Sequence, residues 1–181
     1  MLLQRQPFLI FLIGARASGK STLGRLLAER LQLAFADTDQ EIRAASGLEV
    51  DALVARDGWP AFRVRESAAL RKCARPRTVV ATGGGMALDP RNREFMRAAG
   101  TVFFLDVPAQ LLASRLAEDP RAAQRPSLTG LPPAEEAALV LAEREPAYRA
   151  AAHHCIQAAR PLAELAGELA DIISQTGSIP L

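Results

Sequence analysis

The hydrophobic pattern of this chain alternates between short, unbroken apolar runs and longer stretches with helical spacing. In "FLIFLI" at 8–13 and "TVFFL" at 101–105, apolar side chains follow one another without polar alternation. Unbroken runs of this length are typical of strands covered on both faces, as in a parallel sheet between helices. The pattern therefore predicts an α/β fold.

Five strands are expected in all, with helices in the intervals between them. The strands are expected at or near Phe8–Ile13, Phe35, Thr78–Ala81, Thr101–Asp106 and Ala152–Ile156. Most helices are expected to begin beside a proline, because the first helical turn tolerates one. The expected starts are Lys20, Thr38, Pro60, Pro90, Pro108, Pro133 and Pro161. Without a repeat or a linker, the 181 residues are expected to form one domain, residues 1–181.

One segment breaks this order of elements. Residues 117–133, "AEDPRAAQRPSLTGLPP", contain four prolines and one glycine and lack apolar periodicity. A loop of this length is unusual in a compact domain and is often functional. We expect it to be a mobile lid.

The charge balance narrows the classes of partner. The 22 basic and 20 acidic residues give a net charge of only +2, which argues against a nucleic-acid or acidic membrane surface. The apolar run near the N-terminus is too short to span a bilayer, and no signal-peptide pattern surrounds it. A cytoplasmic protein with neither nucleic acid nor membrane as a partner is expected.

The cysteines and histidines lack the spacing of a metal site. Cys73 and Cys155 are expected as buried free thiols inside a helix and a strand. His153 and His154 are expected to lie at a strand end and not to bind metal.

The clearest chemical signal is "GARASGKST", Gly14 to Thr22, which follows an apolar strand and opens the amphipathic helix "KSTLGRLLAERL". Peptide N–H groups of such a loop converge on phosphate oxygens at a helix N-terminus. The lysine, Lys20, reaches the β and γ phosphates, and the hydroxyl of Ser21 can bind Mg²⁺. The segment is a Walker A loop, so the protein is expected to bind a nucleoside triphosphate.

Other residues decide what is done with that triphosphate. A GTPase would need an Asn-Lys-x-Asp stretch, but Asn92 is the only asparagine in the chain. A small-molecule kinase remains, and it must hold an acceptor hydroxyl in line with the γ phosphate. In "FADTDQEI", Asp37 and Asp39 end the second strand, on the same rim of a parallel sheet as the Walker A loop. Alternatively, Thr38 and Glu41 form a capping box and the acids only favour the helix dipole.

Two arginines are expected on inward-facing helical stripes. Glu66 falls on the apolar stripe of "GWPAFRVRESAALRKCA", where Arg63 is its natural partner. Arg144 falls on a second stripe, with Ala137 and Tyr148. A guanidinium held by Glu66 can present its free edge to an anionic substrate, whereas a structural salt bridge is the alternative.

Three consecutive glycines, Gly83, Gly84 and Gly85, follow the strand at Thr78–Ala81. A glycine run removes all side-chain packing, so either unusual dihedral angles or the bare backbone must be used there. A ligand against the main chain and a plain strand-to-helix turn both remain open.

In combination, these segments resemble the shikimate kinase family. The matching segments, in the family's order, are "GARASGKST" at 14–22, "DTD" at 37–39, "FRVRE" at 62–66, "TGGG" at 82–85, "RPSLTG" at 125–130 and "EREPAYR" at 143–149. The long spacing from Arg115 to Arg125 is more similar to the second of the two enteric-type isozymes than to the shorter-lid form.

The resemblance implies a P-loop NTPase three-layer fold with a five-stranded parallel sheet flanked by helices and a mobile lid. It implies ATP and shikimate as substrates, Mg²⁺ as cofactor, and an acceptor-binding helical region over about 38–75. A monomer is expected. The product would be shikimate 3-phosphate, on the route to aromatic amino acids.

The resemblance also implies residue roles. Lys20, Asp39 and Arg125 are the expected catalytic residues, and Ser21 and Asp37 the expected metal-site residues. Shikimate is expected to contact Asp39, Arg63, Gly83, Gly84, Gly85 and Arg144, with the two arginines on its carboxylate. ATP is expected to contact Gly14, Ala15, Arg16, Ala17, Ser18, Gly19, Lys20, Ser21, Thr22, Arg115 and Arg125.

Three other functions stay open. A kinase of another hydroxy acid, such as gluconate, would share the Walker A loop and the lid. A nucleotide kinase would need a base-reading pocket, which the sequence does not reveal. A non-catalytic nucleotide-binding regulator would have no need of Lys20, Asp37, Asp39 and Arg125 together.

Overall fold

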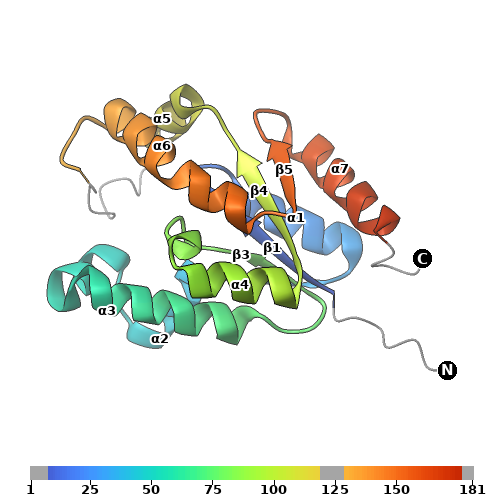
Figure 1. The fold of residues 1–181 in the computed structure, drawn as a ribbon, viewed down its shortest axis with the longest axis horizontal. Helices are drawn as coiled ribbons and strands as arrows, with labels where there is room; N and C mark the ends of the chain where they lie inside the picture. Colours follow the sequence, from blue (N-terminus) through green and yellow to red (C-terminus); the bar gives the residue numbers. More distant parts are fainter. Residues whose placement is uncertain (1–7, 119–128, 177–181) are drawn as a thin grey trace.

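The computed structural model describes residues 8–118 and 129–176 (Figure 1). Its strands form one sheet in which every pair of neighbours is parallel. In spatial order the sheet is β2-β3-β1-β4-β5. The strands are β1 (Leu9–Ile13), β2 (Ala34–Asp37), β3 (Thr78–Ala81), β4 (Thr101–Asp106) and β5 (His154–Gln157). The predicted five-stranded parallel α/β fold is confirmed.

The helices follow the expected order, with one difference. They are α1 (Lys20–Leu31), α2 (Thr38–Ser46), α3 (Val50–Cys73), α4 (Pro90–Ala99), α5 (Ala109–Glu118), α6 (Pro133–Ala151) and α7 (Leu162–Gln175), and the 3₁₀ turn η1 (Met86–Leu88) follows β3. The difference is α3, which begins ten residues before the expected start at Pro60. Gly58 interrupts it with non-helical dihedral angles, φ 77° and ψ 166°. The prediction found the segment after this kink and missed the one before it, although Val50, Leu53 and Val54 already have helical spacing.

Both faces of the sheet are covered, which explains the unbroken apolar runs. Alternate strand residues, such as Ile10, Leu12 and Phe103, pack with α1 and α7. The intervening ones, such as Phe11 and Phe104, pack with residues of α4 and α6. Figure 1 shows the sheet between these two helical layers. Because neither face meets water, no polar alternation is needed along β1 or β4.

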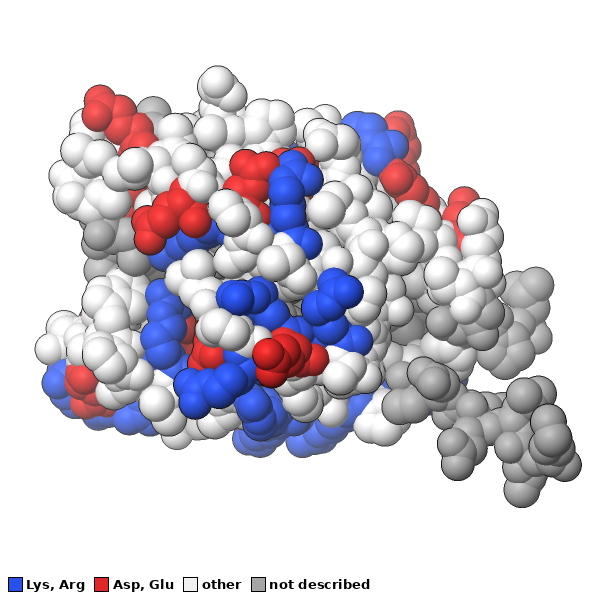
Figure 2. All heavy atoms as spheres, in the orientation of Figure 1, with Lys and Arg blue, Asp and Glu red and all other residues white. Residues whose placement is uncertain are grey.

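Helices α2 and α3 form a smaller body beside the sheet (Figure 1). They pack through their own apolar cluster of Ile42, Leu53, Phe62 and Ala69. This body spans most of the segment 38–75 that was expected to bind the acceptor. It brings one face of α3 toward the segment that follows β3. Figure 2 shows Lys and Arg side chains gathered on the surface over α3 and α4.

The expectation of two buried thiols is half wrong. Cys73 is buried, but Cys155 is exposed. Since β5 is an edge strand and Ile156 faces the α1 and α7 layer, the neighbouring Cys155 points to the opposite face. Among the described residues, no cluster of His, Cys, Asp or Glu is arranged to hold a metal ion.

None of the helices in the described parts of the chain is both long enough and apolar enough to cross a bilayer.

Gly100, between α4 and β4, provides a test of the sheet packing. A Cβ there would lie 2.1 Å from the carbonyl oxygen of Leu9, so the Gly100→Ala substitution must displace β1 or β4. We expect it to lower the free energy of unfolding by about 3 kcal/mol, as overpacking of a core does. The matched control is Gly167→Ala in α7, where a Cβ would meet nothing within 4 Å. It should instead stabilise by about 0.5–1 kcal/mol through helix propensity. Urea denaturation of both variants measures this, and equal midpoints would contradict the packing.

Candidate active site

The Walker A loop is held between β1 and the first turn of α1 by unusual backbone conformations. Gly14, Ala17 and Gly19 have positive φ angles of 143°, 61° and 91°. A Cβ at Gly14 would lie 2.9 Å from the carbonyl oxygen of Leu105 in β4. The first glycine of the motif is therefore required for space as well as for dihedral freedom.

Lys20 lies across the inside of this loop. Its Nζ donates to the carbonyl oxygens of Gly14 (2.9 Å) and Ala15 (2.5 Å) and to Oγ of Ser18 (3.2 Å). The residue is only 8% exposed. The ammonium group is thus positioned where the loop N–H groups and the N-terminus of α1 favour an anion.

Ser21 and Asp37 bring two oxygen donors together beside the loop. The Ser21 hydroxyl donates to Oδ2 of Asp37 at 2.6 Å. Mg²⁺ prefers oxygen ligands and needs only one or two from protein when phosphates and waters supply the rest. The donor set fits that ion.

The start of α2 differs from the capping box that was the alternative interpretation of this segment. Asp37 is the N-cap, with Oδ1 accepting from the backbone N–H groups of Asp39 (2.9 Å) and Gln40 (3.2 Å). Thr38 is fully buried and its Oγ1 accepts from the N–H of Gly83 at 2.8 Å, while Glu41 pairs with Lys72. Thr38 therefore connects α2 to the glycine run and does not cap the helix.

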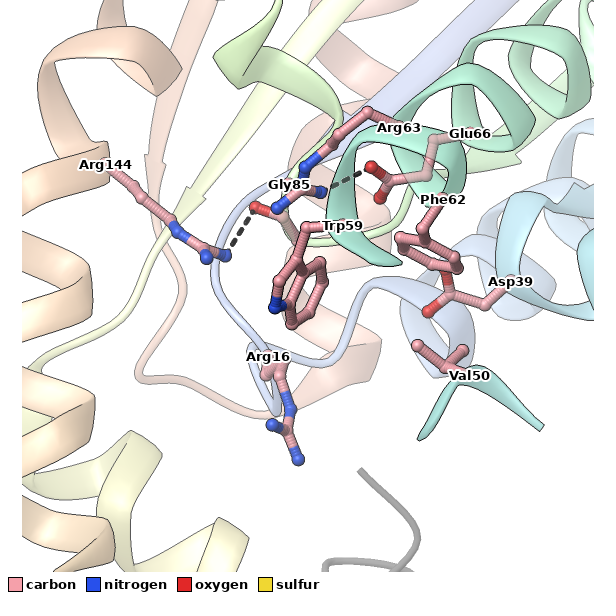
Figure 3. A pocket seen from close by; sticks show the side chains of 10 residues that line it. Arg16, Asp39, Val50, Trp59, Phe62, Arg63, Glu66, Gly85 and Arg144 are labelled. Carbon is pink, nitrogen blue, oxygen red and sulfur yellow. Dashed lines mark hydrogen bonds and ion pairs between the residues drawn. The ribbon is translucent and has the colours of Figure 1, made fainter. Parts of the chain in front are cut away.

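A pocket opens beside the Walker A loop, between α3, α6 and the segment after β3 (Figure 3). Charged side chains and a small apolar wall line it together with the backbone of the glycine run. The lining residues are Arg16, Asp39, Val50, Trp59, Phe62, Arg63, Glu66, Gly84, Gly85 and Arg144. Asp39 and the two predicted arginines, which come from three different helices, thus face one pocket.

Glu66 holds Arg63 in this pocket, as the helical stripe predicted. The two side chains form an ion pair in which Glu66 is only 3% exposed. Burial raises the pKa of the Glu66 carboxyl, and the guanidinium of Arg63 acts in the opposite direction. Arg63 also lies over the Trp59 ring, 5.2 Å from its centroid. The guanidinium is therefore oriented by a carboxylate and an aromatic face.

Arg144 reaches the pocket from the opposite side, on α6. It is 8% exposed, and its Nη1 donates to the carbonyl oxygen of Gly84 at 3.3 Å. A guanidinium carries five N–H donors, so this contact leaves others for an anion in the pocket. Figure 3 shows Arg63 and Arg144 on either side of Gly85.

None of the three glycines has a positive φ. Gly83 and Gly85 are required for space, whereas a Cβ at Gly84 would meet nothing closer than 3.5 Å. A Cβ at Gly83 would lie 2.7 Å from Oδ1 of Asp39, and one at Gly85 would lie 1.8 Å from Nη1 of Arg63. The glycine run therefore makes room for the charged side chains of the pocket itself. Contact of the glycines with a substrate ring stays a prediction.

The other residues that were predicted to contact ATP lie in different places. Arg115 on α5 donates to the carbonyl oxygen of Ala17 at 3.2 Å, so it lies against the Walker A loop. Thr22 is exposed on the first turn of α1. Arg16 lines the pocket beside the Walker A loop as well as belonging to that loop. Arg125 lies outside the described residues, as does most of the expected lid.

Sequence reasoning assigned no role to the apolar wall of the pocket. Val50 and Trp59 belong to the missed or kinked part of α3, and Phe62 lies in the segment whose apolar stripe was predicted without a role in binding. The available signal was the placement of Trp59 between Gly58 and Pro60, because this pair of residues predicts an interruption of a helix. The ring packs edge-on against Phe62, with centroids 5.8 Å apart.

Comparison with known proteins gives one consistent family. The family model described as shikimate kinase matches residues 16–174. The chain is 53% identical over 169 residues to a shikimate kinase of Oleidesulfovibrio alaskensis, covering 93% of this chain and 98% of the relative. It is 54% identical over 149 residues to a shikimate kinase 2 of Syntrophotalea carbinolica, covering 82% and 87%. The name of this second relative agrees with the expected likeness to the second isozyme type.

A solved structure gives the same result. The shikimate kinase from Acinetobacter baumannii in complex with shikimate superposes with a TM-score of 0.88 at 33% identity, covering 95% of this chain and 96% of that one. The order of the motifs, the parallel sheet and these matches show that the chain belongs to the shikimate kinase family.

Proposed function

We propose that this protein transfers the γ-phosphoryl group of ATP to the 3-hydroxyl of shikimate, giving shikimate 3-phosphate and ADP. The observation that carries the proposal is the pocket beside the Walker A loop, in which Arg63 and Arg144 face the same space as Asp39. Two guanidinium groups suit a carboxylate, and an aspartate suits a hydroxyl that must lose its proton. A cyclic hydroxy acid presents both groups.

The Walker A loop would bind the triphosphate. Its N–H groups and Lys20, which now donates to loop carbonyls, would turn to the phosphate oxygens. Ser21 and Asp37 would hold Mg²⁺, Asp37 through a bound water. When bound, the ion neutralises charge on the phosphates.

Asp39 would orient the acceptor hydroxyl and accept its proton. The hydroxyl oxygen forms a bond to the γ phosphorus as the bond from that phosphorus to the β–γ bridging oxygen breaks. Little covalent chemistry is asked of the protein, so catalysis depends on positioning and on cations around the transferred group. Arg125 and the lid over 117–133 are the predicted source of one such cation, and Arg115 is the predicted adenine contact.

The apolar wall of the pocket favours shikimate over gluconate. Val50, Trp59 and Phe62 form an apolar wall against which one face of a ring can pack, whereas an open-chain polyol has no apolar face to bury there. An ADP-release assay with shikimate, gluconate and nucleoside monophosphates tests this. We expect turnover with shikimate, and turnover with gluconate alone would overturn the proposal.

We also propose that the protein is a monomer in the cytoplasm. Sedimentation measures its oligomeric state and so tests whether it is a monomer.

The first prediction concerns Arg63 and Arg144, which together are called the carboxylate clamp. Arg63→Ala and Arg144→Ala should each weaken shikimate binding by about 1.5–3 kcal/mol, the contribution of hydrogen bonds to charged groups. Affinity for ADP should stay unchanged, since the contacts described for these side chains are with Glu66, Trp59 and the Gly84 carbonyl and not with the Walker A loop. Isothermal titration measures both ligands.

The matched control for the clamp is Arg65→Ala, on the same helix as Arg63 but paired with Asp57 at the surface. It should leave both affinities unchanged. Equal losses of shikimate and ADP binding in Arg63→Ala would indicate a general folding defect and contradict a clamp.

The second prediction separates the two aspartates. Asp39→Asn keeps the size of the side chain but removes its negative charge. We expect the turnover number to fall by about 10²–10⁴, as for loss of a general base, with a smaller change in shikimate KM. Asp37→Asn should instead raise the Mg²⁺ concentration needed for half-maximal rate. Asp171→Asn, on the exposed side of α7, is the control. If both site variants behave alike at saturating Mg²⁺, the assigned roles are wrong.

The third prediction concerns Glu66 and pH. In Arg63→Ala the cation that most lowers the Glu66 pKa is gone, while burial and Asp39 still raise it and Arg144 alone opposes them. A carboxyl with a raised folded pKa stabilises the fold fully below its ordinary pKa, and this contribution is lost as pH rises through the raised value. The free energy of unfolding of Arg63→Ala should therefore fall with rising pH relative to Arg63→Ala/Glu66→Gln. Urea denaturation of both variants, from pH values below the ordinary pKa of a glutamate to neutral pH, measures this difference. The same dependence of the unfolding free energy on pH in both variants would refute the prediction.

A further inference from the structure

Tyr148 is a buried polar residue to which the proposed function gives no role. It lies on α6, one turn after Arg144, and is 1% exposed. Its ring stacks on Phe104 of β4, with centroids 5.1 Å apart and planes 28° from parallel. Because the ring is fixed between the helix and the sheet, the position of its hydroxyl oxygen is fixed as well.

That hydroxyl points at the glycine run of the acceptor pocket. It donates to the carbonyl oxygen of Gly84 at 2.6 Å, and the same oxygen accepts from Nη1 of Arg144 at 3.3 Å. One carbonyl therefore connects Tyr148, the pocket backbone and an arginine of the clamp.

The orientation of this carbonyl is not fixed by the glycines themselves. Gly84 and Gly85 have no Cβ, so their shared peptide has wide conformational freedom. At the other end of the run, the N–H of Gly83 is held by Oγ1 of Thr38. The Tyr148 contact is the shorter of the two hydrogen bonds to Gly84, and a short bond from a fixed ring is the stronger restraint on the peptide.

The phenol is also suited to remain a donor. Burial raises the pKa of Tyr148, although the guanidinium of Arg144 acts in the opposite direction. The hydroxyl therefore keeps its proton throughout the neutral pH range, and the hydrogen bond to Gly84 persists.

We propose that Tyr148 is a positioning residue for the substrate carboxylate: its hydroxyl orients the Gly84 carbonyl, and this carbonyl holds Arg144 so that its remaining N–H groups face the pocket. The inference rests on the proposed function, because it assigns Arg144 to the acceptor. It predicts that Tyr148 affects shikimate binding without touching shikimate.

The test is Tyr148→Phe, which removes one hydroxyl and keeps the ring that packs on Phe104. We expect the dissociation constant of shikimate to rise about fivefold to tenfold, the effect of losing one net hydrogen bond. The dissociation constant of ADP should be unchanged. Thr78→Val is the matched control, since it removes a buried hydroxyl bonded to the carbonyl of Pro76, at the opposite end of β3. It should leave both constants unchanged.

A double-mutant cycle with Arg144→Ala separates positioning from a general effect on stability. If Tyr148 acts through Arg144, adding Tyr148→Phe to Arg144→Ala should cause no further loss of shikimate affinity. A merely structural role would lower the melting temperature of Tyr148→Phe and leave its shikimate affinity intact.

Two results would overturn the positioning role alone. One is unchanged shikimate binding in Tyr148→Phe when the wild type binds shikimate normally. The other is the same fold-loss in the presence and absence of Arg144. Failure of the wild-type protein to bind shikimate would overturn the proposed function, and the positioning role with it.

Discussion

The parallel pairing of β1, β2 and β3 is the constraint on which the candidate site depends. Because these strands run in one direction, the segments that follow them open at the same edge of the sheet. The Walker A loop follows β1, Asp37 ends β2, and the glycine run follows β3. Hydrogen bonds between Ser21 and Asp37 and between Thr38 and Gly83 then connect neighbouring segments. The Walker A loop and the pocket beside it are thus held at one edge of the sheet, although α2 and α3 separate β2 from β3 in the chain.

Charge in the acceptor pocket is tolerated because each buried charge has a specific neighbour. Glu66 is buried against Arg63, and Arg144 is bonded to the Gly84 carbonyl. Leaving one partner of such a pair alone in a buried site is costly, which ties the stability of α3 to the geometry of the clamp. The glycine run completes the arrangement, since a Cβ at Gly83 or Gly85 would occupy the space of Asp39 or Arg63. The missing Cβ atoms thus provide the space that the charged side chains of the pocket occupy.

Helix α6 links the clamp to the core of the sheet. Arg144 and Tyr148 are one turn apart, so both side chains project from the same face toward Gly84. Tyr148 also stacks on Phe104 in the middle of β4. The position of a charged group in the pocket is therefore fixed by an aromatic contact within the apolar layer, which is less mobile than a surface loop.

Local patterns in the sequence determined the strands, most helix starts and the Walker A loop, because unbroken apolar runs, proline positions and glycine spacing act over a few residues. The pairing of Arg63 with Glu66 was also predictable, since i, i+3 neighbours on a helix must meet. Contacts between elements that are far apart in the chain were not predictable from the sequence. Only the tertiary structure decided that Asp37 and not Thr38 caps α2, that Cys155 faces outward on an edge strand, that Trp59 lines the pocket and that Tyr148 bonds to Gly84. Each of these features depends on which elements pack together. Thr38 and Gly83 are 45 positions apart, and Gly84 and Tyr148 are 64 positions apart. No periodicity of the sequence links residues at such separations.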